Sequence, residues 1–203
     1  MWQPVLMIDG FILSVLGLTM LIPAAFDIYE QKLLQSPFLT ASFVTIFIGM
    51  TLFLASKVRI NRISLKQGYL VTCACWLSVA VFASIPFYLY GIGGNISSAL
   101  FEGTSGITGT GATVVFDVEA LPRSVLIWRS ILNGLGGIGI IIFAVAMLPF
   151  LGIGGMQIFQ RENADTGDKF MPKFHYIAKR IILVYVLFDI SCIVCLYFAG
   201  MGW

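Results

Sequence analysis

Residues 101–114 hold the residue types whose spacing could do chemistry, and they read FEGTSGITGTGATV. Thr108, Thr110 and Thr113 are interleaved with glycine and alanine. Glycine permits backbone angles that other residues avoid, so successive carbonyl oxygens could point in one direction. Carbonyl oxygens that replace a cation's hydration shell give ion channels their selectivity. The segment therefore predicts an extended cation-binding strand, and a glycine-rich outer turn without a ligand is the alternative.

A short helix is expected directly before this strand. Gly91–Asn95 breaks the preceding apolar run, and residues 96–107 are too few to cross a bilayer. Ser97 or Ser98 is expected to cap the N-terminus of this helix. The C-terminus of such a half-helix carries a partial negative charge, which suits a cation. The order of helix, half-helix, extended strand and helix favours a pore loop over a simple turn.

The composition requires a membrane around these elements. Of the 203 residues, 59% are hydrophobic and only 11% are charged, which excludes a soluble globular domain, a disordered chain and a coiled coil. Threonine and glycine at membrane depth must be buried in protein or line a water-filled cavity. We predict an all-α polytopic membrane protein with one re-entrant half-helix, an extended filter and five spans, at about 5–26, 38–56, 68–90, 128–150 and 179–199.

The basic residues predict the orientation of these spans. Nine of the twelve lysines and arginines lie in or beside two loops, residues 57–66 and 161–180. By the positive-inside rule these loops and the N-terminus are cytoplasmic, and residues 91–127 face outside. A net charge of +2 is too small to indicate nucleic-acid binding. The predicted location is the cell (inner) membrane.

A second motif has the form of a dinucleotide-binding loop. Gly134–Gly139 reads GLGGIG, a match to G-x-G-x-x-G. Such a loop needs a preceding strand and an acidic residue about 20 positions further on. Position 159 is phenylalanine and the first acid is Glu162. Close packing of neighbouring helices on a glycine-rich span is the better interpretation, and no catalytic triad or metal-ligand cluster supports any enzyme.

A few charged residues near the spans have open roles. Glu102 either hydrogen-bonds behind the strand and attracts cations, or is a solvated helix acid. Arg129 is expected to brace the loop through backbone carbonyl oxygens. Asp9 is expected to reach water near the N-terminus, whereas Asp189, in the middle of a span, is expected to be neutral and to pair with a hydroxyl such as that of Tyr185.

Four segments together resemble one family. Phe101–Val114, Trp128–Ser130, Gly136–Ile140 and Leu148–Gln157 are similar to the TrkH/KtrB potassium-uptake proteins of the Trk/Ktr/HKT superfamily. The resemblance is closest to the TrkH branch and covers essentially the whole chain, as the N-terminal portion of such a protein. It implies four parts: an N-terminal helix pair (1–66), a first helix–pore–helix repeat (67–157), a cytoplasmic linker (158–178) and the first helix of a second repeat (179–203).

The resemblance also implies site residues and partners. Members build a potassium pore from four non-identical repeats, and the filter glycine of the first repeat matches Gly111. Gly109 stands where members often have threonine, but its carbonyl is retained. The transported ion would be K+, held at Thr110 and Gly111, with no covalent cofactor. The implied filter positions are Thr108, Gly109, Thr110, Gly111, Ala112 and Thr113, with Glu102 and Arg129 as pore support.

The implied partners follow from the same family. They are the remaining pore repeats, the lipid bilayer and a TrkA-like cytoplasmic nucleotide-binding regulatory subunit near Gln160–Lys173. This interpretation assigns the chain to a Trk-type potassium-uptake system as the donor of one filter strand. The alternative is a non-conducting, truncated or regulatory membrane subunit that needs partner repeats.

Overall fold

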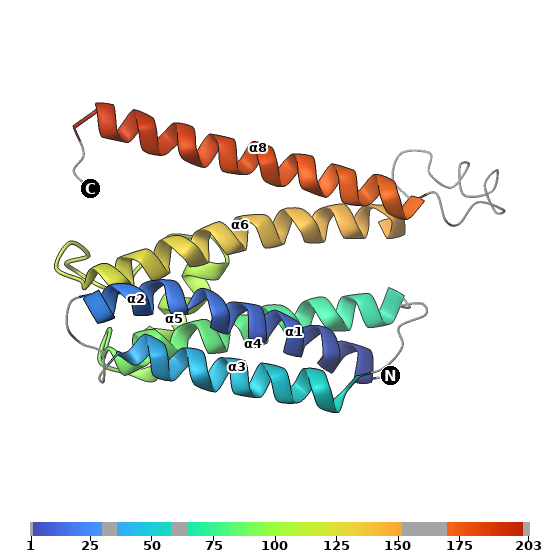
Figure 1. The fold of residues 1–203 in the computed structure, drawn as a ribbon, viewed down its shortest axis with the longest axis horizontal. Helices are drawn as coiled ribbons and strands as arrows, with labels where there is room; N and C mark the ends of the chain where they lie inside the picture. The colour runs from blue at the N-terminus through green and yellow to red at the C-terminus, as the bar shows by residue number, and fades with distance from the viewer. Residues whose placement is uncertain (1, 30–35, 58–64, 152–169, 201–203) are drawn as a thin grey trace. The chain divides into compact units, whose positions relative to one another are not determined.

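The computed structural model describes residues 2–29, 36–57, 65–151 and 170–200, and every regular element in these ranges is a helix (Figure 1). The chain divides into two units, Met1–Gly137 and Ile138–Trp203, which are described separately. The helices are α1 (Gln3–Thr19), α2 (Leu21–Tyr29), α3 (Pro37–Ala55), α4 (Leu65–Leu89), α5 (Ile96–Ile107), α6 (Arg123–Leu151) and α8 (Phe170–Phe198).

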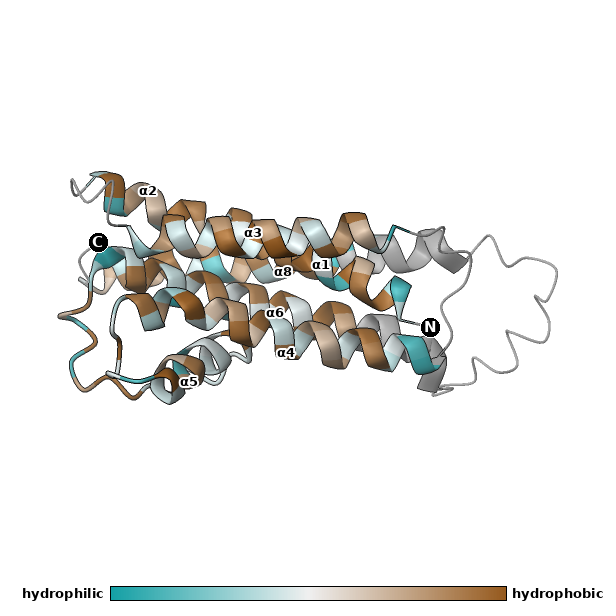
Figure 2. Cartoon of the chain, turned by 90° about the horizontal axis from the view of Figure 1, so that it is seen from below, coloured by the Kyte–Doolittle hydropathy of each residue, from teal (hydrophilic) through white to brown (hydrophobic). Residues whose placement is uncertain are grey.

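Five stretches of these helices are long and apolar enough to cross a membrane, which confirms the predicted fold class. Hydrophobic residues follow the helices along their length (Figure 2). The short helix α5 has the bounds predicted for the half-helix. The spans are Gln3–Tyr29, Pro37–Ala55, Lys66–Leu89, Arg123–Phe143 and Lys179–Phe198.

In the first unit, α1 packs against α3 and α4. The α1–α3 contact is close because small residues face each other, and a Cβ atom on Gly10 would lie 2.6 Å from the carbonyl oxygen of Gly49. Ser42 Oγ on α3 also donates a hydrogen bond to the carbonyl oxygen of Gly17, at 2.7 Å. Helices α1 and α3 therefore form a closely packed pair, and α4 packs against this pair.

The α4 helix packs against α5 and against the start of α6. Gly103 of α5 lies against Ser84 of α4, where a Cβ atom on the glycine would come within 2.8 Å of the serine Cβ. Trp128 of α6 is fully buried and donates a hydrogen bond from Nε1 to the carbonyl oxygen of Ala83, at 3.0 Å. Both contacts fix elements of the predicted pore loop on one scaffold helix.

The helices differ from the predicted layout in three places. The first span is two helices, with a break at Met20 and a proline, Pro23, in the first turn of α2. The α6 helix begins at Arg123 instead of 128, because Pro122 starts its first turn and the polar residues 123 and 124 do not stop a helix.

The third difference lies in the segment predicted as a linker. Residues 170–178 of this segment belong to α8, because hydropathy marks where a helix enters the membrane and not where it begins. Residues 152–169, which include most of the linker and the end of the 148–157 segment, lie outside the described residues. The α8 helix has no buried residue in its spanning window.

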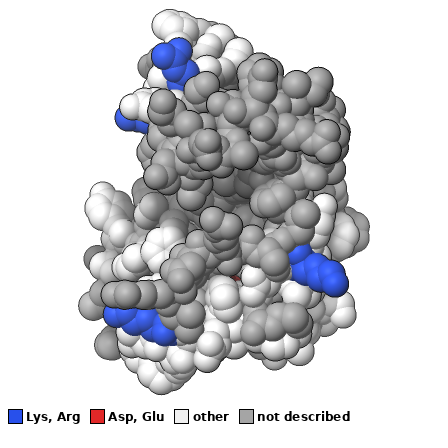
Figure 3. Space-filling model, turned by 90° about the vertical axis from the view of Figure 1, so that its right-hand side faces the viewer, with Lys and Arg blue, Asp and Glu red and all other residues white. Residues whose placement is uncertain are grey.

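Lysine side chains mark one end of the first unit. Exposed Lys57 follows α3, and exposed Lys66 lies in the first turn of α4. Figure 3 looks onto the end at which these two helices and the N-terminus lie, and lysine or arginine side chains are visible there among the described residues. The half-helix α5 lies toward the opposite end of α4 (Figures 1 and 2).

Candidate functional site

The half-helix α5 begins at an asparagine cap. Asn95 has an extended backbone, and its side-chain oxygen accepts a hydrogen bond from the backbone N–H of Ser98, at 2.8 Å. The expectation that Ser97 or Ser98 would be the cap was therefore wrong. Asparagine caps helices as well as serine does, and the Gly-Gly-Asn sequence before α5 was the signal for it.

A glycine cap ends α5. Gly109 has a φ angle of +68° and donates from its N–H to the carbonyl oxygen of Gly106, at 3.0 Å. The N–H of Thr110 reaches back to the carbonyl oxygen of Ser105, also at 3.0 Å. These two bonds form a Schellman motif, which requires a left-handed residue and explains the glycine. Gly109 therefore both ends the half-helix and begins the strand.

Residues 108–114, which follow α5, form no β-strand, and we keep the name strand for them only because of their predicted role in a filter. Gly111 also has a left-handed φ angle, +70°, and residues 108–114 are exposed in this chain. Within the described ranges, the carbonyl oxygens of Thr108, Gly109, Thr110 and Gly111 accept no hydrogen bond from the protein. The Ala112 carbonyl differs, because it accepts from Ser105 Oγ at 2.6 Å. Four consecutive carbonyl groups are thus available to a ligand.

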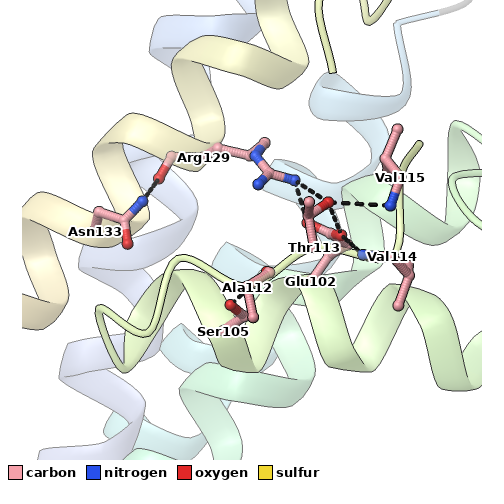
Figure 4. A network of polar contacts seen from close by, with 8 residues as sticks. All are labelled: Glu102, Ser105, Ala112, Thr113, Val114, Val115, Arg129 and Asn133. Carbon is pink, nitrogen blue, oxygen red and sulfur yellow. Dashed lines mark hydrogen bonds and ion pairs between the residues drawn. The ribbon is translucent and has the colours of Figure 1, made fainter. Parts of the chain in front are cut away.

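A group of four residues, which we call the clamp, holds the far end of the strand: Glu102, Thr113, Val114 and Arg129 (Figure 4). Glu102 Oε1 accepts from Thr113 Oγ1 at 2.5 Å and from the Val114 N–H at 2.8 Å. Its other oxygen, Oε2, pairs with Arg129 Nη1, which also donates to Thr113 Oγ1 at 3.1 Å. Both carboxylate oxygens are therefore satisfied by the strand and by α6.

Glu102 is the more deeply buried of the two charged residues of the clamp. The Glu102 side chain is 1% exposed and the Arg129 side chain is 18% exposed. Arg129 was expected to bond backbone carbonyl oxygens, and this was wrong, because a charged guanidinium forms a stronger bond with an ionised carboxylate than with a neutral carbonyl. The pairing leaves the strand's carbonyl oxygens free.

The glycines of α6 permit a close helix contact. A Cβ atom on Gly136 would lie 2.0 Å from the carbonyl oxygen of Ile107, the last residue of α5, whereas one on Gly134 would meet no atom within 4 Å. Residues 134–139 are helical, with no strand before them. The dinucleotide-loop alternative is therefore contradicted, and the packing interpretation holds at Gly136.

Two membrane acids were placed wrongly by the sequence. Asp9 is 7% exposed and does not reach water, and its Oδ1 accepts a hydrogen bond from Ser78 Oγ of α4 at 2.5 Å. Asp189 is exposed on α8 and, among the described residues, has no bond to Tyr185. Asp27, which the sequence analysis missed, is 1% exposed. Its signal was a single acid at the end of a long uncharged run.

The sequence profile of the TrkH family, described as cation transport protein, matches residues 34–201 of this chain. The chain belongs to the TrkH family. The crystal structure of the potassium transporter TrkH from Vibrio parahaemolyticus aligns with a TM-score of 0.83 and 31% identity, over 100% of this chain and 40% of that protein.

Members of the TrkH family with curated names agree with this assignment. The Trk system potassium uptake protein TrkG of Escherichia coli K12 is 38% identical over 197 residues, which are 95% of this chain and 40% of TrkG. The protein TrkI of Halomonas elongata, also named as a Trk system potassium uptake protein, is 35% identical over 205 residues, 99% of this chain and 41% of TrkI. The chain thus spans well under half the length of these relatives.

Proposed function

We propose that this chain contributes one strand of a potassium selectivity filter and conducts K+ across the membrane together with further pore repeats. The backbone carbonyl groups of Thr108–Gly111 coordinate the dehydrated ion, with Thr110 and Gly111 as the central positions. Ala112 and Thr113 form the end of the strand that the protein holds. The relatives' names, which specify potassium uptake, support K+ as the ion.

One observation carries the proposal: a half-helix ends on a strand whose carbonyl groups have no partner in the described protein, while its far end is fixed by the clamp. A selectivity filter replaces the hydration shell of the ion with backbone carbonyl oxygens, so these oxygens must be presented to the ion and not bonded within the protein. Glu102 and Arg129 meet that need as positioning residues without competing for the ion.

A single strand cannot surround an ion. The family resemblance implies four repeats around one axis, and residues 108–114 are exposed in this chain, as expected for a surface that faces partner repeats. The chain covers 40% of the aligned TrkH structure. We therefore propose that the remaining repeats supply the other strands, either in the same polypeptide or in separate copies.

The same proposal orients the chain in the cell membrane. Lys57 follows α3 and Lys66 lies at the start of α4, at the end of the first unit that holds the N-terminus (Figure 1). By the positive-inside rule that end is cytoplasmic and the strand is extracellular. A TrkA-like regulatory subunit would then meet the cytoplasmic residues near 160–173. The Trk system named for the relatives supports a partner of this kind.

Uptake-deficient cells test the proposal directly. The cells should carry the whole native locus of this gene, so that any repeats encoded beside this chain are also expressed. The influx of Rb+, a K+ analogue, is then measured. We expect Rb+ influx, growth at low K+ and weaker competition by Na+ than by K+. Absence of Rb+ influx from cells in which the chain is present in the membrane would contradict conduction and favour the non-conducting subunit.

A further inference from the structure

A second polar network lies in the first unit, and we call it the joint: Asp27, Ser36, Tyr90 and Ser124. Asp27 Oδ2 accepts hydrogen bonds from Ser36 Oγ at 2.7 Å and from the Tyr90 hydroxyl at 2.5 Å. The Tyr90 hydroxyl lies 3.0 Å from Ser124 Oγ. Because the tyrosine proton is used toward Asp27, Ser124 is the donor in this last bond. Hydrogen bonds that are linked in a chain polarise and strengthen one another.

The joint connects four helix ends. Asp27 lies near the end of α2, Ser36 is the N-cap of α3, Tyr90 follows the last residue of α4, and Ser124 lies in the first turn of α6. Asp27, Ser36 and Ser124 are buried, at 1%, 3% and 2% exposed, and Tyr90 is partly buried. Removing a buried acceptor leaves its donors unsatisfied, so the four ends depend on this one acid.

Three aromatic side chains pack against one another next to the joint. The Phe38 ring lies 5.5 Å from the Tyr90 ring and 6.0 Å from the Trp128 ring, centroid to centroid. Phe38 and Trp128 are both fully buried. Tilted and edge-on rings at these distances attract one another. Helix α3, which belongs to the N-terminal pair, is thereby in contact with the start of α6.

One face of α6 leads from the joint to the half-helix. Ser124, Trp128, Leu132 and Gly136 are spaced four residues apart, so they share a face of the helix. Leu132 lies against Gly106, and Gly136 lies against the carbonyl of Ile107, both in α5. A rotation or shift of the first turn of α6 would therefore move the contacts on α5.

Arg129 follows directly after Trp128 on α6 and pairs with Glu102 of the clamp. A turn of α6 about its axis would draw the guanidinium away from both Glu102 and Thr113. We propose that Asp27 is a positioning residue of the filter: through Tyr90 and Ser124 it fixes the start of α6, and so it sets the ion preference of the strand that the clamp holds. This inference rests on the proposed function and gives the N-terminal helices a role in selectivity.

The chain contains a matched control for this inference. Asp9 is also a buried acid of the N-terminal helices, and it also accepts a short hydrogen bond from a hydroxyl of α4, that of Ser78. Among the described contacts, the Asp9 network does not continue to α6. Removing each carboxylate in turn therefore separates the loss of a buried hydrogen bond from the loss of the link to the filter.

The test compares Asp27→Ala with Asp9→Ala in the native-locus protein and measures the ratio of Rb+ to Na+ influx. We expect Asp27→Ala to lower the ratio by about 2- to 30-fold, the range typical of coupled positions, and Asp9→Ala to leave it unchanged. Asp27→Asn keeps an oxygen for both hydroxyl donors, so it should restore the ratio. Tyr90→Phe keeps the ring and removes the link, so it should act like Asp27→Ala.

A second measurement does not depend on conduction. In the purified protein, hydrogen exchange of the peptide that contains the Val114 amide reports on the clamp, because this amide is bonded to Glu102. Exchange should become at least about threefold faster in Asp27→Ala and Tyr90→Phe and stay unchanged in Asp9→Ala. Equal ratios and equal exchange in the Asp27 and Asp9 variants would overturn the inference. Missing influx in the wild type would reject the proposed function and the role of Asp27 in ion preference, whereas the expected exchange pattern would still support the link from Asp27 to the clamp.

Discussion

An Arg129→Met variant is expected to lose about 3–5 kcal/mol of stability, because it leaves the carboxylate of Glu102 buried and without its cation. The Glu102 side chain is 1% exposed, so little water reaches its carboxylate to replace the lost cation. Its remaining bonds, from Thr113 and the Val114 N–H, do not neutralise the charge. Methionine fills the volume of the arginine stem, so the loss reports on the charge and not on a cavity.

Two further variants, Glu102→Gln and the double variant, test whether the loss of stability comes from the unpaired carboxylate. Glu102→Gln keeps an oxygen for Thr113 and Val114, and the unpaired Arg129 is 18% exposed, so the loss should be smaller. Glu102→Gln combined with Arg129→Met removes both charges and should be more stable than Arg129→Met alone. Melting temperatures of the four detergent-purified proteins measure this cycle. Additive losses would show that the two side chains do not act as a pair.

A Gly136→Ala variant is also expected to lose a large part of its stability. Its Cβ atom would lie 2.0 Å from the carbonyl oxygen and 2.7 Å from the carbonyl carbon of Ile107. These are backbone atoms at the end of α5, so relief requires the half-helix or α6 to move. Forcing a methyl group into such a contact costs about 1–3 kcal/mol or more, and the shift would also displace the strand.

Gly134 is the natural control, because it lies in the same helix two residues earlier. A Cβ atom there meets nothing within 4 Å, and alanine favours a helix over glycine by about 1 kcal/mol. The melting temperature should therefore fall for Gly136→Ala and stay or rise for Gly134→Ala. A fall of the same size in both variants would show that flexibility of α6, and not contact with α5, is what these glycines provide.

The sequence was sufficient for the elements whose signals are local. The uncharged runs predicted five spans, and the break at Gly91–Asn95 together with the glycines after Ile107 predicted α5 at residues 96–107, as found. Local hydropathy did not give the helix ends at 123 and 170, because polar residues continue a helix outside the membrane.

The site could be predicted only as a set of candidates. Glu102 and Arg129 were both chosen, but their pairing across 27 positions follows from how α5 and α6 pack, which no spacing in the sequence encodes. The contact between Asp27 and Tyr90 spans 63 positions, and an acid that follows an uncharged run gives no sign of its partner. Long-range hydrogen bonds of this kind become visible only in the folded chain.

Gly109 shows how one residue can carry two signals. The sequence and the family resemblance placed it in the filter for its carbonyl group. The structure also makes it the left-handed residue that closes α5, with the bonds of a Schellman motif. A role in the filter and a role as a helix cap require the same backbone freedom, so the residue type alone could not separate them.

The most direct test of the central claim, that residues 108–113 form a potassium filter strand, compares Gly111→Ala with Gly94→Ala. Both glycines have left-handed φ angles, +70° and +75°, and a Cβ atom on either would meet nothing within 4 Å. Alanine therefore costs each about the same 1–2 kcal/mol of backbone strain. Only Gly111 lies in the strand, whereas Gly94 lies in the turn before α5.

The measurement is Rb+ influx into uptake-deficient cells that express each variant from the native locus at equal membrane levels. We predict that Gly111→Ala lowers the influx about tenfold or more, as expected if most of that strain falls on the ion-binding conformation, and that Gly94→Ala retains the wild-type influx. Equal influx through the two variants would contradict the assignment of this strand to the filter.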